Sequence, residues 1–218
     1  MPLLSSEHLA RTYSPPTERD AWEQVKLYRQ SQRYPDDWGA ARVASAINAD
    51  DEVPFENLSR SNLRAWVEGD GMPDAARAVM VAEELGWVAE EWTPTVRAFA
   101  ELVIGVFACG SIAKTSWVPT WAPDSAVGRE SIEAALERTG VGYKQINRDG
   151  HNRADELRPR QHASILGRAL HVAGAPLGDK NLESTAGLPE WLATAPPSVR
   201  GSAAELLVRE RAIVYPKK

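Results

Sequence analysis

The chain has 218 residues, of which 43% are hydrophobic, and it carries a formal net charge of −5 at pH 7. This length suits one large domain or two small ones, and the hydrophobic share is enough for buried cores. The single cysteine excludes an intrachain disulfide framework and a multi-cysteine zinc site, and only four histidines are present. We therefore expect a reduced, cytoplasmic protein with neither a metal nor a cofactor.

Charge and hydropathy also restrict the partners of the chain. An acidic protein is a poor default binder of nucleic acid, so any contact with phosphates has to depend on local basic patches. The longest nearly apolar run, Leu102–Cys109, is too short to span a bilayer. The first residues lack a basic start followed by a long apolar stretch, so we predict no signal peptide and no membrane partner.

The first part of the chain predicts helices only. Residues 1–17 are expected to be a loose N-terminal extension, because Ser14, Pro15 and Pro16 break regular structure. Residues 18–88 are expected to form an all-α domain. Apolar periodicity, capping residues and terminal glycines predict its helices near Thr17–Arg33, Asp36–Asn48, Leu58–Gly69 and Pro73–Trp87.

The second part mixes helices with strands, which makes the predicted fold class α+β. After a linker at residues 88–94, the second domain is expected at residues 95–215. Its elements follow the order αββαββα: helix Pro94–Cys109, strands within Ser111–Ala122, helix Arg129–Thr139, strands on both sides of Asp149-Gly150, and helix Gln161–Ala173. A short helical turn at "LPEWL" and a last helix from Ser198 to about Ala212 complete the prediction.

Two tryptophans lie close together in the first strand segment. Trp117 and Trp121 are four residues apart, so in one strand both would point to the same face. We expect them in core or interface packing rather than in base stacking, which no spacing favours.

Two consecutive helices of the first domain have the features of a helix-turn-helix. In the first of them, Val43 and Ile47 lie one turn apart and can face the next helix. In the second, Leu63, Trp66 and Val67 form an apolar stripe for the core. Polar residues remain on its outward and N-terminal positions, which are the positions that contact bases in a recognition helix.

Residues 36–69 resemble the helix-turn-helix of resolvases, transposases and many prokaryotic regulators, in which a similar "SRSNLRAWV" helix reads DNA. One departure is the long, acidic gap "ADDEVPFEN" in place of a turn of three to four residues. The alternative is an ordinary α-hairpin with a solvated outer face. The residues expected to contact DNA here are Arg42, Ser59, Arg60, Ser61, Asn62 and Arg64.

Residues 95–212 resemble a LAGLIDADG homing-endonuclease half-domain. The apolar "LVIGVFACG" (Leu102–Gly110) has the length and profile of the family's signature helix, and "GSI" leads into the first strand. The stretch Gly174–Leu192 is similar to the family's segment after the second helix, with a glycine, a lysine and an "LP" turn. The αββαββα order is also that of the family.

The resemblance implies a homodimer. In that family the signature helices pack face to face at a two-fold axis, and small residues let their backbones approach. The residues expected at this dimer interface are Leu102, Gly105, Ala108 and Cys109. Gly110 is expected to let the chain turn sharply from the helix into the first strand.

The resemblance does not extend to catalysis. The family's helix carries an acid before its final glycine, and that acid holds the divalent metal. Here the position is Cys109, and a neutral thiol does not hold magnesium. Lys180 matches the family's lysine, but it has no activated water to act on. We therefore expect an inactive nuclease; the alternative is an active one in which Glu101 or Asp124 replaces the lost acid.

The resemblance also places the sheet as a saddle along the major groove of DNA. The hairpin Tyr143–Arg160 has a modest basic excess, and alternate residues of a strand share a face. A solvated hairpin face is the alternative. The hairpin residues expected to contact DNA are Lys144, Asn147, Arg148, Arg153, Arg158 and Arg160.

Together these patterns predict a sequence-specific binder of double-stranded DNA. The expected role is transcription regulation or control of a mobile element by a protein derived from a homing endonuclease. Two other hypotheses remain: an active endonuclease with a displaced acid, and a protein-interaction module without DNA binding. The net charge of −5 favours the last of these.

Overall fold

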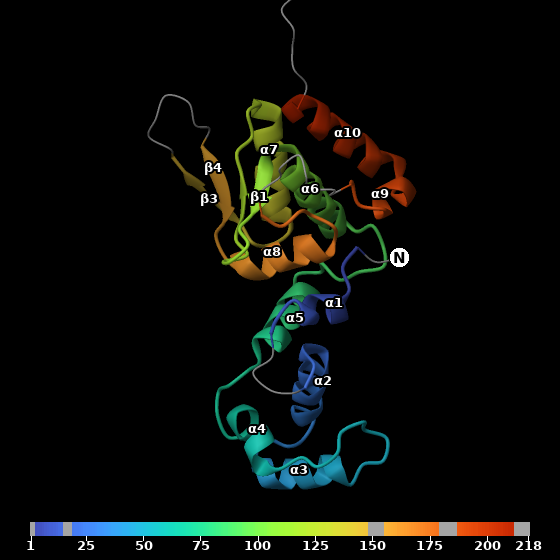
Figure 1. Ribbon diagram of the computed structural model, residues 1–218, viewed down its shortest axis with the longest axis vertical. Coiled ribbons are helices and arrows are strands. Elements are labelled where there is room, and N and C mark those ends of the chain that lie inside the picture. Colours follow the sequence, from blue (N-terminus) through green and yellow to red (C-terminus); the bar gives the residue numbers. More distant parts are fainter. Residues whose placement is uncertain (1–2, 15–18, 148–154, 179–186, 212–218) are drawn as a thin grey trace, which may run out of the picture. The chain divides into compact units, whose positions relative to one another are not determined.

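The computed structural model describes residues 3–14, 19–147, 155–178 and 187–211. The chain divides into two compact units (Figure 1). The N-terminal unit comprises residues 6–81, and the C-terminal unit comprises residues 82–218 together with residues 1–5. The fold is a mixed α+β one, with the strands confined to the C-terminal unit in the described ranges. None of the helices in these ranges has the length and apolar character that crossing a membrane requires.

The N-terminal unit is helical in its described residues. Its helices are α1 (Ser6–Arg11), α2 (Ala21–Ser31), α3 (Ala40–Asn48), α4 (Arg60–Val67) and α5 (Asp74–Glu84), the last of which crosses into the second unit. Helix α1 was not expected, and it forms because Leu9 and Ala10 are buried. Helix α2 begins after Asp20, whose side chain accepts a hydrogen bond from the backbone N–H of Trp22.

Helices α3 and α4 share one hydrophobic core. Its buried side chains come from α2, α3, α4 and the segment between α3 and α4: Leu27, Ala40, Val43, Ala44, Ile47, Phe55, Leu58 and Leu63. The predicted positions of Val43 and Ile47 toward the next helix, and of Leu63 in the core, are therefore confirmed. Trp66 and Val67 are half-buried against the same core.

The long segment between α3 and α4 is fixed to α3 at its far end. The side-chain amide of Asn48 donates a hydrogen bond to the carbonyl of Leu58 at 2.8 Å and accepts one from the N–H of Leu58 at 2.9 Å. Phe55 and Leu58 are buried in the core below. This clamp and these two anchors place the start of α4 beside the end of α3, despite a connection longer than the usual turn.

The C-terminal unit follows the predicted order αββαββα. Its elements are α6 (Pro94–Cys109), β1 (Gly110–Ile112), β2 (Pro119–Trp121), α7 (Ala126–Arg138), β3 (Tyr143–Ile146), β4 (Glu156–Pro159), α8 (Ala163–Val172), α9 (Trp191–Thr194) and α10 (Pro197–Arg211). The strands form one antiparallel sheet in the order β1-β2-β4-β3. Both predicted strand pairs are therefore confirmed.

Helix α6 is the centre of the C-terminal unit. It packs against α7, α8, α10, β1 and β2, and α10 runs along it in Figure 1. Leu102, Gly105 and Ala108 are buried within the chain, and Cys109 is half-buried. These residues are thus covered by their own chain, and the expectation that they form a dimer interface is wrong for this structure.

The small residues of α6 accommodate Trp121 instead of a second helix. A Cβ atom added at Gly105 would lie 2.9 Å from Nε1 of Trp121 and 2.5 Å from Cδ1 of Ile132. A Cβ atom at Gly110 would lie 2.7 Å from Cδ1 of Trp121. Gly110 itself has φ −122°, which any residue adopts, so its backbone does not need glycine for a sharp turn. Both glycines are required by the fully buried indole of Trp121.

The boundary between the units precedes the predicted one. Trp87 is fully buried, donates from Nε1 to the carbonyl of Thr139 at 2.9 Å, and stacks on Phe99. These partners assign Trp87 to the C-terminal unit, which begins at Ala82 rather than after residue 88.

Trp117 also differs from expectation, because it lies in the turn between β1 and β2 with φ +58°.

Candidate nucleic-acid interface

The start of α4 is held by its own polar residues. Ser59 is the N-cap, and its backbone N–H donates to Oδ1 of Asn62 at 2.8 Å. The hydroxyl of Ser59 also donates to Asn62 Oδ1 at 2.9 Å and lies 2.7 Å from the hydroxyl of Ser61. These three residues are exposed, so the cap is presented to solvent. The hydrogen bonds at the start of α4 therefore orient the polar atoms of these residues.

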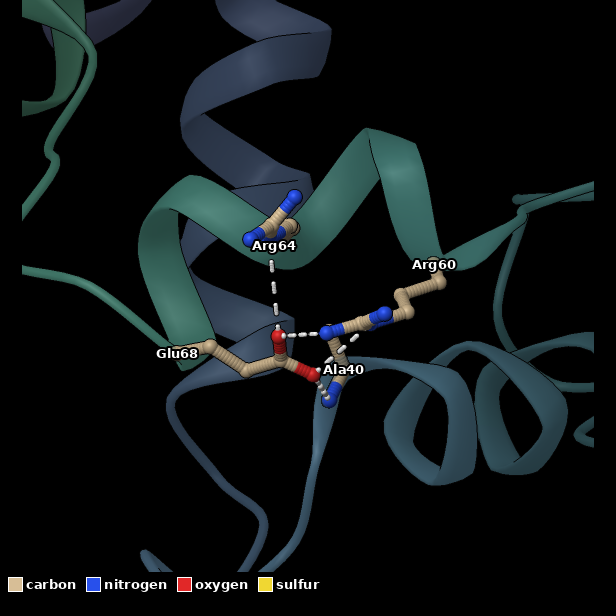
Figure 2. A network of polar contacts seen from close by, with 4 residues as sticks. All are labelled: Ala40, Arg60, Arg64 and Glu68. Atoms are coloured by element: carbon tan, nitrogen blue, oxygen red, sulfur yellow. Dashed lines mark hydrogen bonds and ion pairs between the residues drawn. The ribbon is translucent and has the colours of Figure 1, made fainter.

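Two exposed arginines lie along α4 and converge on one carboxylate (Figure 2). The guanidinium of Arg60 donates to both oxygens of Glu68, at 3.1 Å from Nε and 2.6 Å from a terminal nitrogen. Arg64 Nε lies 3.7 Å from Glu68. The side chains of Arg60 and Arg64 remain 56% and 69% exposed, against 27% for Glu68. The arginines are therefore positioned by Glu68 but accessible to a ligand.

Glu68 also caps the preceding helix of the pair. Gly39, the N-cap of α3, has no side chain to accept from the helix N-terminus, and the N–H of Ala40 donates to Glu68 Oε1 at 3.0 Å instead. A carboxylate is favourable at this position because the N-terminus of a helix carries partial positive charge. Helix α3 thus begins at Ala40 and not at Asp36, and its cap comes from the end of α4.

The network around Glu68 predicts a pH effect on stability. Hydrogen bonds from Arg60, and next from the N–H of Ala40, lower the pKa of Glu68 below its usual value of 4.5. A carboxyl with a lowered folded-state pKa contributes stability above its unfolded pKa, and this stability is lost as pH falls through the folded pKa. We expect the Tm of the wild type to fall more steeply below about pH 4.5 than that of Glu68→Gln.

Thermal unfolding followed by circular dichroism over this pH range measures the difference. The matched control is Glu56→Gln, an exposed carboxyl of the same unit without an ion pair to the described residues. The control is expected to keep the wild-type slope. Parallel curves for the wild type and Glu68→Gln would contradict a role for Glu68 in holding α3 and α4.

Arg42 of α3 forms part of an aromatic stack rather than an ion pair. Its guanidinium carbon lies 3.8 Å from the ring centroid of Trp38, and the rings of Trp38 and Tyr34 stack at 5.5 Å. Both rings are half-buried and Arg42 is exposed. The stack restricts the side chain of Arg42, while its N–H groups can still donate outward.

In the C-terminal unit, register places Lys144 and Arg158 on one face of the sheet. Leu157 pairs with Trp121 and both are fully buried, so their face is the core face. Lys144 pairs directly with Arg158 on the opposite face. Arg160 lies just beyond the end of β4, where its backbone N–H donates to the carbonyl of Gly142 at 3.2 Å. Lys144 and Arg160 are exposed, and Arg158 is half-buried with an ion pair to Glu156 at 2.8 Å.

The remaining predicted hairpin residues divide into two groups. Asn147 is exposed at the end of β3, where its side-chain oxygen accepts from Gln145 at 3.0 Å. Arg148 and Arg153 lie outside the described residues, as does Lys180. Like charges directly opposite each other are unfavourable in an antiparallel pair, and here Glu156 offsets the charge of Arg158 beside Lys144.

Sequence reasoning missed Glu68, which organises the α4 arginines. Arg64 and Glu68 have the i,i+4 spacing of a helical ion pair, which could have suggested their contact. No local pattern indicates the contacts of Glu68 with Arg60 and with Ala40, because Arg60 is eight residues away and Ala40 is on another helix.

Of the two acids considered for a displaced nuclease site, Glu101 accepts a hydrogen bond from the hydroxyl of Ser131. Asp124 is exposed before α7, and its backbone N–H donates to Glu210. In the described ranges no group of three or more His, Cys, Asp or Glu side chains lies together as metal ligands would. No family model, curated protein or solved structure matches this chain.

Proposed function

We propose that this chain binds double-stranded DNA in a sequence-specific way, as a regulator of transcription or of a mobile element. In this proposal α3 and α4 form the helix-turn-helix, with α4 in the major groove. The C-terminal unit is a LAGLIDADG-like half-domain that contributes a basic sheet face. The proposal contains no cleavage step, because Cys109 stands where the family has its metal-binding acid and a thiol does not hold magnesium.

The observation that carries the proposal is the exposed pair Arg60 and Arg64 on a buried two-helix scaffold. Glu68 accepts two hydrogen bonds from Arg60 and lies 3.7 Å from Nε of Arg64, yet more than half of each arginine side chain is open to solvent. Arginine donors in this arrangement match guanine edges or phosphates. The core beneath α3 and α4 makes the scaffold rigid, and a recognition helix needs a rigid scaffold to place its side chains.

A second support is the open face of the sheet. Lys144 lies directly opposite Arg158, Arg160 follows just beyond the end of β4, and of these three only Arg158 has an ion pair to the described residues. Lys144 and Arg160, which have no ion pair to the described residues, remain available for phosphates. Acidic residues beside the helices oppose the binding of DNA. The proposal therefore requires that the contacts with DNA be concentrated on the exposed side of α4 and on the open face of the sheet.

A gel-shift selection from random duplexes tests the proposal. It is run without magnesium at two stated salt concentrations, because phosphate contacts weaken as salt rises. We expect an enriched motif whose affinity falls with salt. Since α6 is covered by its own chain, a single motif without two-fold symmetry is the expected result.

Two other results have definite meanings. An enriched palindrome would indicate a dimer that uses a surface other than α6. No enrichment at either salt concentration would refute DNA reading and favour a protein-interaction module, to which the acidic net charge also points.

A further inference from the structure

A pocket in the C-terminal unit lies between α6, the end of α7 and α10. It has a volume of about 150 Å³ and is open on one side. Its apolar wall includes Ile104, Val199, Ala203 and Leu206, all of them buried. Its rim is polar, and the charged side chains on the rim are Arg97, Glu101 and Arg138.

The three charged groups of this pocket do not neutralise one another. Arg97 and Glu101 have the i,i+4 spacing of a helical ion pair, but they do not form one. Arg97 instead donates to the carbonyl of Trp92 at 3.0 Å and to the hydroxyl of Ser198 at 3.1 Å. Glu101 accepts from Ser131.

Arg138 brings the second cation from α7. Its Nε donates to the carbonyl of Ala134 at 3.2 Å, and its terminal N–H groups have no hydrogen bond to the described residues. Two guanidiniums and one carboxylate give the pocket a net charge of +1. A bound group with one negative charge would balance it.

We propose that this pocket binds a small organic carboxylate with a short apolar tail. Arginine recognises a carboxylate through two parallel N–H···O hydrogen bonds, and the tail would contact the wall formed by Ile104, Val199 and Leu206. The volume limits the tail, since a protein cavity of about 150 Å³ holds a molecule of the size of benzene. Glu101 lines the same pocket, and its charge disfavours a second negative charge on the ligand.

The site is independent of the proposed DNA contacts. All its residues lie in the C-terminal unit, and none of them is on the open sheet face. Its test therefore uses the full chain without DNA. Benzoate and isovalerate are the probes, and benzamide and isovaleramide are their uncharged controls.

NMR titration of the backbone amides measures binding. We expect saturable shifts confined to α6, the end of α7 and α10, with a Kd of about 0.1–1 mM for the acids, as ligands of this size allow. The amides should bind at least about tenfold more weakly, because they lack the charge that the arginines recognise.

Variants localise the effect. Arg97→Gln and Arg138→Gln should each weaken benzoate binding about tenfold or more. Ser202→Leu, at an exposed rim position of α10, should block entry without disturbing the core. Arg200→Gln removes the same charge from an exposed α10 position that does not line the pocket, and should bind like the wild type.

Two results would overturn the proposal. One is equal binding of the acids and their amides. The other is equal weakening by Arg200→Gln and by the two pocket variants, which would show attraction to the general charge of the surface. Loss of DNA binding in a separate assay has no bearing on either result.

Discussion

Replacing Gly105 with alanine is expected to lower the free energy of unfolding of the C-terminal unit by about 1–3 kcal/mol, the usual cost of overpacking a core. Alanine is normally the better helix former, so the expected sign opposes helix propensity. The reason is space: the new methyl group would lie 2.5 Å from Ile132 Cδ1 and 2.9 Å from Trp121 Nε1. Denaturant unfolding followed by tryptophan fluorescence measures the loss.

The matched control is another glycine inside a helix. A Cβ atom at Gly201 of α10 meets nothing within 4 Å. Gly201→Ala is therefore expected to stabilise the unit by about 0.5–1 kcal/mol through helix propensity alone. If both variants change stability in the same direction, Gly105 is not the contact surface for Trp121.

A second-site change examines the mechanism of the Gly105→Ala loss. Ile132→Val removes the Cδ1 atom nearest to the new methyl group, and alone it should cost about 0.5–1.5 kcal/mol. In the Gly105→Ala background it should cost less or restore stability. Simple additivity of the two changes would show that Ile132 and residue 105 do not compete for one space.

Replacing Arg60 with alanine is expected to weaken binding to the selected duplex by about 1–3 kcal/mol, which is roughly 5- to 150-fold. Arg64→Ala should have an effect of the same sign. Each change removes a guanidinium from the exposed face of α4 and leaves Glu68 with less positive charge to offset it. Fluorescence anisotropy at fixed salt with the selected duplex and with a scrambled one separates base reading from phosphate contact.

Two further variants complete this test. Arg77→Ala removes an exposed arginine from α5 of the same unit and should leave affinity almost unchanged. Glu68→Gln keeps an oxygen for the N–H of Ala40 but removes the negative charge beside the arginines, so it should tighten binding. Weaker binding by Glu68→Gln would indicate that the orientation of the arginines matters more than the charge beside them. If Arg77→Ala weakens binding as much as Arg60→Ala, α4 is not the recognition helix.

The helices and strands that sequence reasoning placed well have local signals. Helix α6 runs from Pro94 to Cys109 as predicted, because Thr93 caps it through the N–H of Val96 and proline suits its first turn. The order αββαββα was also predictable from turns and periodicity. In each case the residues that decide the structure are neighbours in sequence.

What sequence reasoning could not place depends on partners far along the chain. An apolar helix with small residues fits a dimer interface or an interior equally well, and the later elements α7, α8, α10 and β2 that pack on α6 decide that it is interior. The start of α3 depends on Glu68, which is 28 residues from Ala40. Neither the aspartates at 36 and 37 nor the local pattern reveals that a remote carboxylate caps this helix.

The central position of α6 also sets a condition on synthesis of the protein. The ribosome makes α6 nearly ninety residues before it makes α10, which covers one side of it. At about 5–20 residues per second this delay lasts about 4–18 s, during which that apolar side has no native cover. The nascent chain therefore presents a hydrophobic helix to chaperones for a defined interval, while the N-terminal unit is already complete.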